Sequence, residues 1–99
     1  MGSISVYLEN GFENDLVTLS AAGEERDEAN VTTRYQIGLA SVVELTLPDG
    51  VSSTLRVTVP NRGLAAEATV DPRVTPHVRV NAARNSLVVQ PEADPPMFA

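Results

Sequence analysis

The chain contains no cysteine, lysine or tryptophan, and its only histidine is His77. Without cysteine there is no disulfide framework and no thiolate metal site. One histidine, no cysteine and no G-x-S-x-G elbow are a poor basis for nucleophilic catalysis, because each such mechanism needs a nucleophile held beside a base. The sequence therefore predicts no cofactor and leans against an enzyme.

Positive charge is also scarce. Seven arginines face 13 acidic residues, which gives a formal net charge of -6. Such a chain is repelled by nucleic acids and by anionic membranes, so we expect no nucleic-acid partner. No apolar run approaches the roughly 18 residues of a membrane-spanning helix, so membrane insertion is not expected. The first residues lack the features of a signal peptide, and the absence of cysteine slightly favours the cytoplasm, but the compartment stays unknown.

The hydrophobic residues that are present recur with a period of two. Ile4, Val6 and Leu8 alternate with polar neighbours, as in a strand that buries one face. The Asn10-Gly11 pair that follows is typical of a hairpin turn. The same alternation returns in later runs, over residues 16–21, 31–39, 42–47, 54–59, 64–70, 78–82 and 87–89.

This rhythm predicts one all-β domain, an antiparallel β-sandwich of about seven to eight short strands. In outline it resembles immunoglobulin-like or transthyretin-like sandwiches, although no residue motif connects it to either family. The domain is expected to span residues 1–90. The Pro-rich acidic segment 91–99 is interpreted as a tail or linker that cannot extend a sheet, and the charged stretch 23–28 as a polar loop.

Few residues are candidates for binding. Phe12 lies in the first predicted turn and Tyr35 in a predicted strand, and either ring offers a surface for a ligand. An aromatic ring at the position of Phe12 is equally well explained as a plug over the core. Met97 and Phe98 end the tail, where they either dock into a neighbouring protein or belong to a frayed terminus.

Acidic side chains gather in two segments and raise the question of calcium. Glu13 and Asp15 follow the first strand, and Asp27 lies in the charged stretch after the second. Calcium prefers clustered oxygen ligands, so these three residues are weak candidates. Neither segment matches a known calcium loop, and a solvated acidic surface is the favoured explanation.

Elimination leaves a non-catalytic interaction or assembly module. A sandwich exposes strand edges that pair readily with other strands, and Lys and Pro are not available within the predicted strands to block them. We therefore expect self-association through exposed edges or faces, giving a homo-oligomer or a complex with a protein partner. One alternative is an accessory ligand- or carbohydrate-binding domain. The least favoured is a small hydrolase or isomerase, which needs His77 beside a carboxylate in a cleft.

Overall fold

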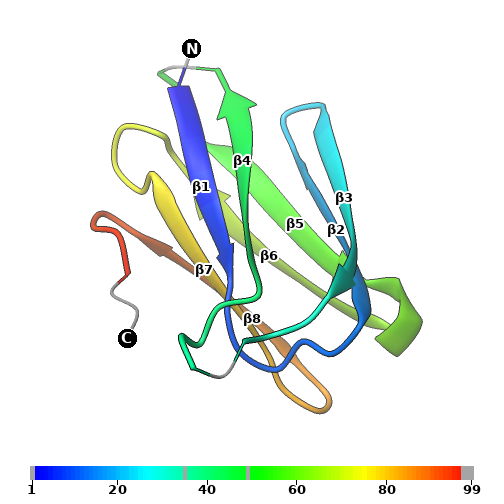
Figure 1. The fold of residues 1–99 in the computed structure, drawn as a ribbon. Helices are drawn as coiled ribbons and strands as arrows, with labels where there is room; N and C mark the ends of the chain where they lie inside the picture. The colour runs from blue at the N-terminus through cyan, green and yellow to red at the C-terminus, as the bar shows by residue number, and fades with distance from the viewer. Residues whose placement is uncertain (1, 35, 49, 97–99) are drawn as a thin grey trace.

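The computed structural model describes residues 2–34, 36–48 and 50–96, and it confirms an all-β sandwich (Figure 1). Two four-stranded sheets pack face to face, in the strand orders β4-β1-β7-β8 and β3-β2-β5-β6. The strands are β1 (Gly2–Leu8), β2 (Asp15–Ala21), β3 (Glu24–Val31), β4 (Ser41–Leu47), β5 (Ser53–Val59), β6 (Leu64–Val70), β7 (His77–Ala82) and β8 (Leu87–Glu92). A short 3-10 helix, η1 (Pro60–Arg62), connects β5 to β6. No helix in the described part of the chain is long and apolar enough to cross a membrane.

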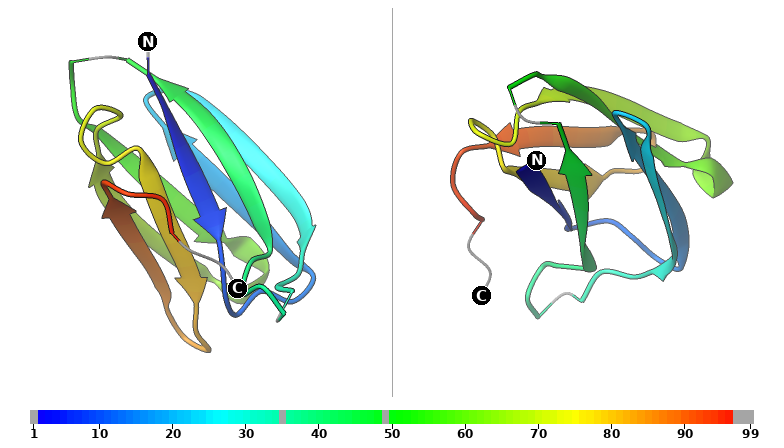
Figure 2. Two further views of the ribbon diagram at one scale, coloured as in Figure 1. Left: turned by 60° about the vertical axis from the view of Figure 1, so that its left-hand side comes forward. Right: turned by 90° about the horizontal axis from the view of Figure 1, so that it is seen from above.

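The core lies between the two sheets and follows the predicted alternation (Figure 2). Ile4, Val6 and Leu8 of β1 are fully buried, as are Val17 and Leu19 of β2. Burying a side chain of this size contributes roughly 1.5–3 kcal/mol, which is why one face of each strand is fixed so firmly. The largest buried side chain is that of Phe12, which closes the core at one end.

The sheets are not purely antiparallel, which corrects one part of the expectation. β1 pairs in parallel with β7, with Val6 opposite Val78, while every other pair of neighbouring strands is antiparallel. The Asn10-Gly11 turn is also not a hairpin turn, because β1 and β2 belong to different sheets. Both strands carry a complete apolar row, and placing them in opposite sheets buries both rows in one core.

Gly11 is essential to this crossing between sheets. Its φ is +90°, a conformation that side-chain-bearing residues rarely adopt. A Cβ at this position would lie 1.7 Å from the carbonyl oxygen of Ala82, so the backbones could not approach as they do.

Two predicted boundaries are wrong. The charged stretch is not a loop, because residues 24–31 form β3 against β2, whose ladder outweighs the low strand propensity of Glu and Asp. The predicted strand over 31–39 ends at Val31, and the described residues beyond it form turns with an isolated bridge between Arg34 and Leu39. Asn30, with a φ of +56°, lies at a register shift within β3, after which Val31 still pairs with Asp15 of β2 before the strand ends.

The last strand also runs further than expected. Pro91 lies within β8, opposite Val78, and the strand ends at Glu92. Pro is tolerated there because β8 is at the edge of its sheet, so the missing N–H faces away from β7.

Candidate functional site

The predicted binding residues do not gather at one place. Phe12 is only 1% exposed, and its backbone N–H donates to Thr33 Oγ1 at 3.0 Å. Its position is that of the plug over the core, with no ring face left open to a ligand. Tyr35, Met97 and Phe98 lie outside the described residues.

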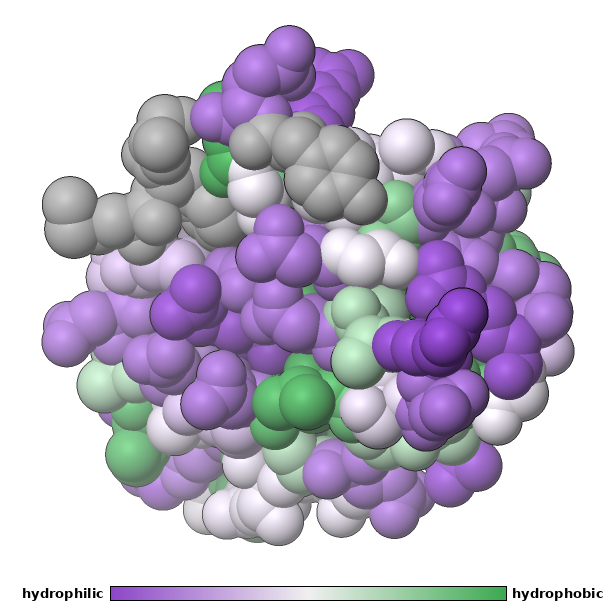
Figure 3. Space-filling model, turned by 90° about the horizontal axis from the view of Figure 1, so that it is seen from below, coloured by the Kyte–Doolittle hydropathy of each residue, from purple (hydrophilic) through white to green (hydrophobic). Residues whose placement is uncertain are grey.

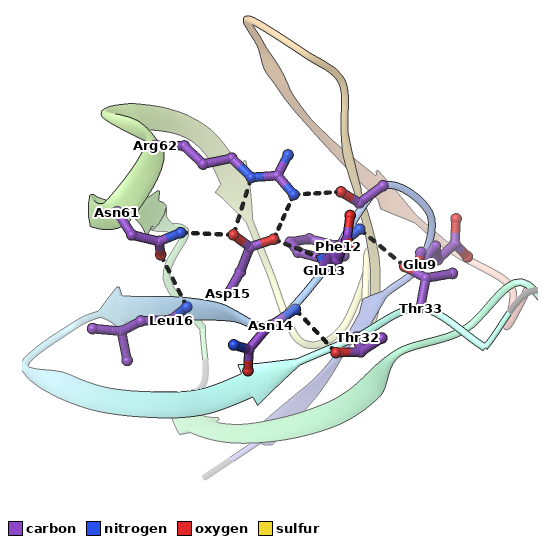
Figure 4. A network of polar contacts seen from close by, with 11 residues as sticks. Glu9, Phe12, Glu13, Asn14, Asp15, Leu16, Thr32, Thr33, Asn61 and Arg62 are labelled. Carbon is purple, nitrogen blue, oxygen red and sulfur yellow. Dashed lines mark hydrogen bonds and ion pairs between the residues drawn. The ribbon is translucent and has the colours of Figure 1, made fainter.

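Two of the weak calcium candidates, Glu13 and Asp15, are neighbours in one polar network (Figure 4). Asp15 is 1% exposed, and its carboxylate accepts four hydrogen bonds from N–H groups. These come from Arg62 Nε at 3.0 Å, Arg62 Nη2 at 2.6 Å, Asn61 Nδ2 at 2.8 Å and the backbone N–H of Glu13 at 2.9 Å. Its lone pairs are therefore already occupied by N–H donors. Asp27 lies on β3, opposite Thr18 of β2.

Burial raises the pKa of Asp15, but the hydrogen bonds from Glu13, Asn61 and Arg62 outweigh burial and leave this pKa below its ordinary value. Arg62 also donates to the carbonyl of Gly11 at 2.8 Å, so one side chain joins the β1–β2 crossing to η1. This network is a structural clamp between two turns. The described residues contain no group of three or more His, Asp or Glu side chains placed to hold a metal ion.

A second buried carboxylate was missed from the sequence. Glu9 is 1% exposed, and it accepts hydrogen bonds from Arg79 Nε at 2.8 Å and Asn81 Nδ2 at 2.9 Å. The hydrogen bond to Glu9 raises the pKa of Arg79. The only local signal was a charged residue just after β1 and another at an outward position of β7. Their contact depends on the parallel pairing of β1 with β7, which local periodicity does not reveal.

His77 meets an aromatic side chain and not a carboxylate. Its Nδ1 lies 3.0 Å from Tyr7 Oη, and the two rings are 5.8 Å apart. Asp71, a carboxylate six residues before His77 in the sequence, accepts a hydrogen bond from the backbone N–H of Arg73 within its own turn. In the described part of the chain, Asp71 and His77 therefore have different partners.

The end of the sandwich that holds the β1–β2 crossing offers no broad apolar surface. Seen from this side, the coloured surface is mostly hydrophilic, with hydrophobic side chains in small separate patches (Figure 3). Larger apolar surface patches are the usual mark of docking faces. The strand edges are a second kind of surface through which a sandwich can bind.

The edge at β3 is blocked by charge. Directly opposite residues of an antiparallel pair point to the same face. Val17 and Leu19 of β2 are buried in the core, and opposite them on β3 lie Glu28 and Arg26. These charges point toward the core side of the sheet, so an added strand would place its own apolar row against them. Inward-pointing charge is a common device for protecting an edge.

The two edges of the other sheet offer less to a new strand. Pro91 lies within β8 and cannot donate to a ladder. The core-facing residues of β4, Val43, Leu45 and Leu47, are already at most 6% exposed, so pairing there would bury little more apolar surface. Glu44 points outward from β4, and no arginine in the described part of the chain lies within ion-pair distance of it.

The edge at β6 has none of these obstacles. It contains neither Pro nor Gly, and its core-facing residues Leu64, Ala66 and Ala68 are apolar and only partly buried. Its one charged residue, Glu67, points outward and pairs with Arg56 of β5 at 3.2 Å. Because the cation comes from the neighbouring strand, the charge on this edge is neutralised within the chain.

Comparison of the chain with family models, with curated proteins and with solved structures finds no match.

Proposed function

We propose that this protein is a non-catalytic interaction module that self-associates by adding a strand to the β6 edge. The observation that carries the proposal is the contrast between β6 and the other three edge strands. The other edges have inward charge, an internal proline or a core-facing row that is already buried, whereas β6 has none of these.

Strand addition at β6 is favoured by two separate contributions. An edge strand has one hydrogen-bonded neighbour, so alternate N–H and C=O groups of β6 point away from β5 and have no partner strand within their own sheet. A new strand would satisfy them, and it would also cover the partly buried row formed by Leu64, Ala66 and Ala68.

The proposal is tested by measuring mass against concentration. Sedimentation equilibrium of the wild-type chain should show a dimer whose population rises with protein concentration. Ala66→Lys copies the inward charge of β3 onto β6, and it should weaken the dimer by at least about tenfold, which corresponds to roughly 1.4 kcal/mol.

Thr54→Lys is the matched control, because it adds the same charge to the exposed face of β5, an interior strand of the same sheet. This variant should dimerise like the wild type. Circular dichroism of both variants checks that the sheet is retained. A wild-type chain that remains monomeric at the highest soluble concentration contradicts the proposal, as does an equal loss of dimer in both variants.

A further inference from the structure

We infer that the strand added to β6 is β6 of a second copy, paired antiparallel across a two-fold axis that passes beside Ala66. This inference rests on the self-association proposed above and specifies its geometry. The two four-stranded sheets β3-β2-β5-β6 would then form one continuous eight-stranded sheet.

The pleat limits the registers that a symmetric pair can adopt. Core-facing residues must lie opposite core-facing residues, because a slip by one residue turns a whole strand over. In a two-fold pair the axis then passes beside one residue, and this residue lies directly opposite the same residue of the second copy. Three such registers keep most of β6 paired, with the axis at Ala66, at Glu67 or at Ala68.

Charge disfavours the axis at Glu67. That register gives the longest overlap, but it places two Glu67 side chains directly opposite each other, and like charges in this position are destabilising. With the axis at Ala66, Glu67 lies opposite Ala65 of the second copy. The outward row then runs from Arg56 through Glu67 to that alanine, with no like charges facing each other.

Burial distinguishes the remaining two registers. With the axis at Ala66, Leu64 of each copy lies opposite Ala68 of the other, so two partly buried apolar positions cover each other. With the axis at Ala68, Leu64 extends beyond the paired segment, and Val70 takes a place in it. Val70 is already fully buried, so that register gains less apolar contact. The axis at Ala66 is therefore the register that avoids facing like charges and also gains more apolar contact.

The chain has no cysteine, so a single introduced thiol can form a disulfide only with the same thiol of a second copy. The rate of cross-linking therefore measures the register directly. Ala66→Cys, Glu67→Cys and Ala68→Cys each place a thiol at one candidate axis. Directly opposite Cβ atoms lie within about 5.5 Å, close to disulfide distance, while thiols displaced along the strand are out of reach. Each variant is oxidised mildly at a concentration where sedimentation shows the wild type to be dimeric.

Ala66→Cys should form disulfide-linked dimers at least about ten times faster than the other two variants. Adding the Ala66→Lys chain beforehand should not slow this cross-linking, because that variant should compete poorly for the β6 edge. The double variant Leu64→Cys with Ala68→Cys should also cross-link between copies. Faster cross-linking of Glu67→Cys or Ala68→Cys overturns the register. A dimeric wild type with no cross-link in any variant overturns pairing at β6 across a two-fold axis. A monomeric wild type instead overturns the proposed self-association itself.

Discussion

β3 and β6 are the two edge strands of one sheet, and they differ in the residues of their core-facing rows. Both strands have one neighbour and expose backbone groups, yet β3 directs Arg26 and Glu28 toward the core side while β6 places alanine and leucine there. Under the proposed function, strand addition depends on the core-facing row of an edge, and not on backbone exposure alone. Each of the following changes tests one component of that contrast.

The largest effect is expected from the clamp that holds the β6 end of the sheet. Asp15→Ala leaves Arg62 without its buried partner and releases η1, which leads into β6. The free energy of unfolding should fall by about 3 kcal/mol, as when one partner of a buried ion pair is removed. Urea unfolding measures this change. Asp27→Ala, at an exposed position of β3, is the control and should change stability by less than about 0.5 kcal/mol.

The same clamp should respond to acid. The pKa of Asp15 is below its ordinary value of 3.8, so its ionised form is favoured by folding. Its contribution is complete above that ordinary pKa and is lost as the pH falls through the lower pKa of the folded state. The stability difference between wild type and Asp15→Asn should therefore be constant near neutral pH and shrink below pH 3.8. A difference that grows in acid would contradict the hydrogen-bonded carboxylate.

Converting β3 into an edge like β6 should create a second site of association. The combined change Glu24→Thr, Arg26→Val and Glu28→Thr removes the core-side charges of this strand. We expect sedimentation velocity to show species larger than the wild-type dimer. Glu25→Thr with Asp27→Thr, which removes outward charges, should leave the wild-type pattern. If both combinations behave alike, the direction of the charges does not matter.

The smallest effect concerns the neutralised charge on β6. Arg56→Ala leaves Glu67 unpaired beside the proposed interface, and the dimer should weaken by about two- to threefold, because exposed ion pairs contribute little. The loss should diminish at high salt. Arg26→Ala on β3 removes the same charge away from this edge and should leave the dimer constant unchanged. An equal effect in both variants would point to net charge and not to the local pair.

Much of the strand pattern was predictable, because alternation is a local property. Residues 4–8, 42–47 and 54–59 fall in strands with the predicted faces buried. The Pro-Asn-Arg-Gly sequence at 60–63 is typical of a turn, and Gly63 after η1 has a φ of +67°. β3 was missed because its charged residues have low strand propensity, and only its neighbour β2 holds it in the sheet.

The sequence predicted the kind of candidate site, an exposed strand edge, but not which strand provides it. Exposed edges follow from any open sandwich, and the lack of proline and of core-side charge in residues 64–70 was visible in the sequence. Which strands occupy the edges was not visible, because edge position depends on pairings between distant segments. The same reason hid the contacts of Glu9 with Arg79 and of Asp15 with Arg62.

The sequence by itself determined that the chain forms short strands with one apolar face, and that it contains one histidine and no cysteine. Both follow from composition and from a period of two, which each segment carries locally. Only the tertiary structure decided that β1 pairs in parallel with β7 and that β6 lies at an edge. Alternation fixes which face of a strand is buried, but it leaves its neighbours open, because many pairings can bury the same row.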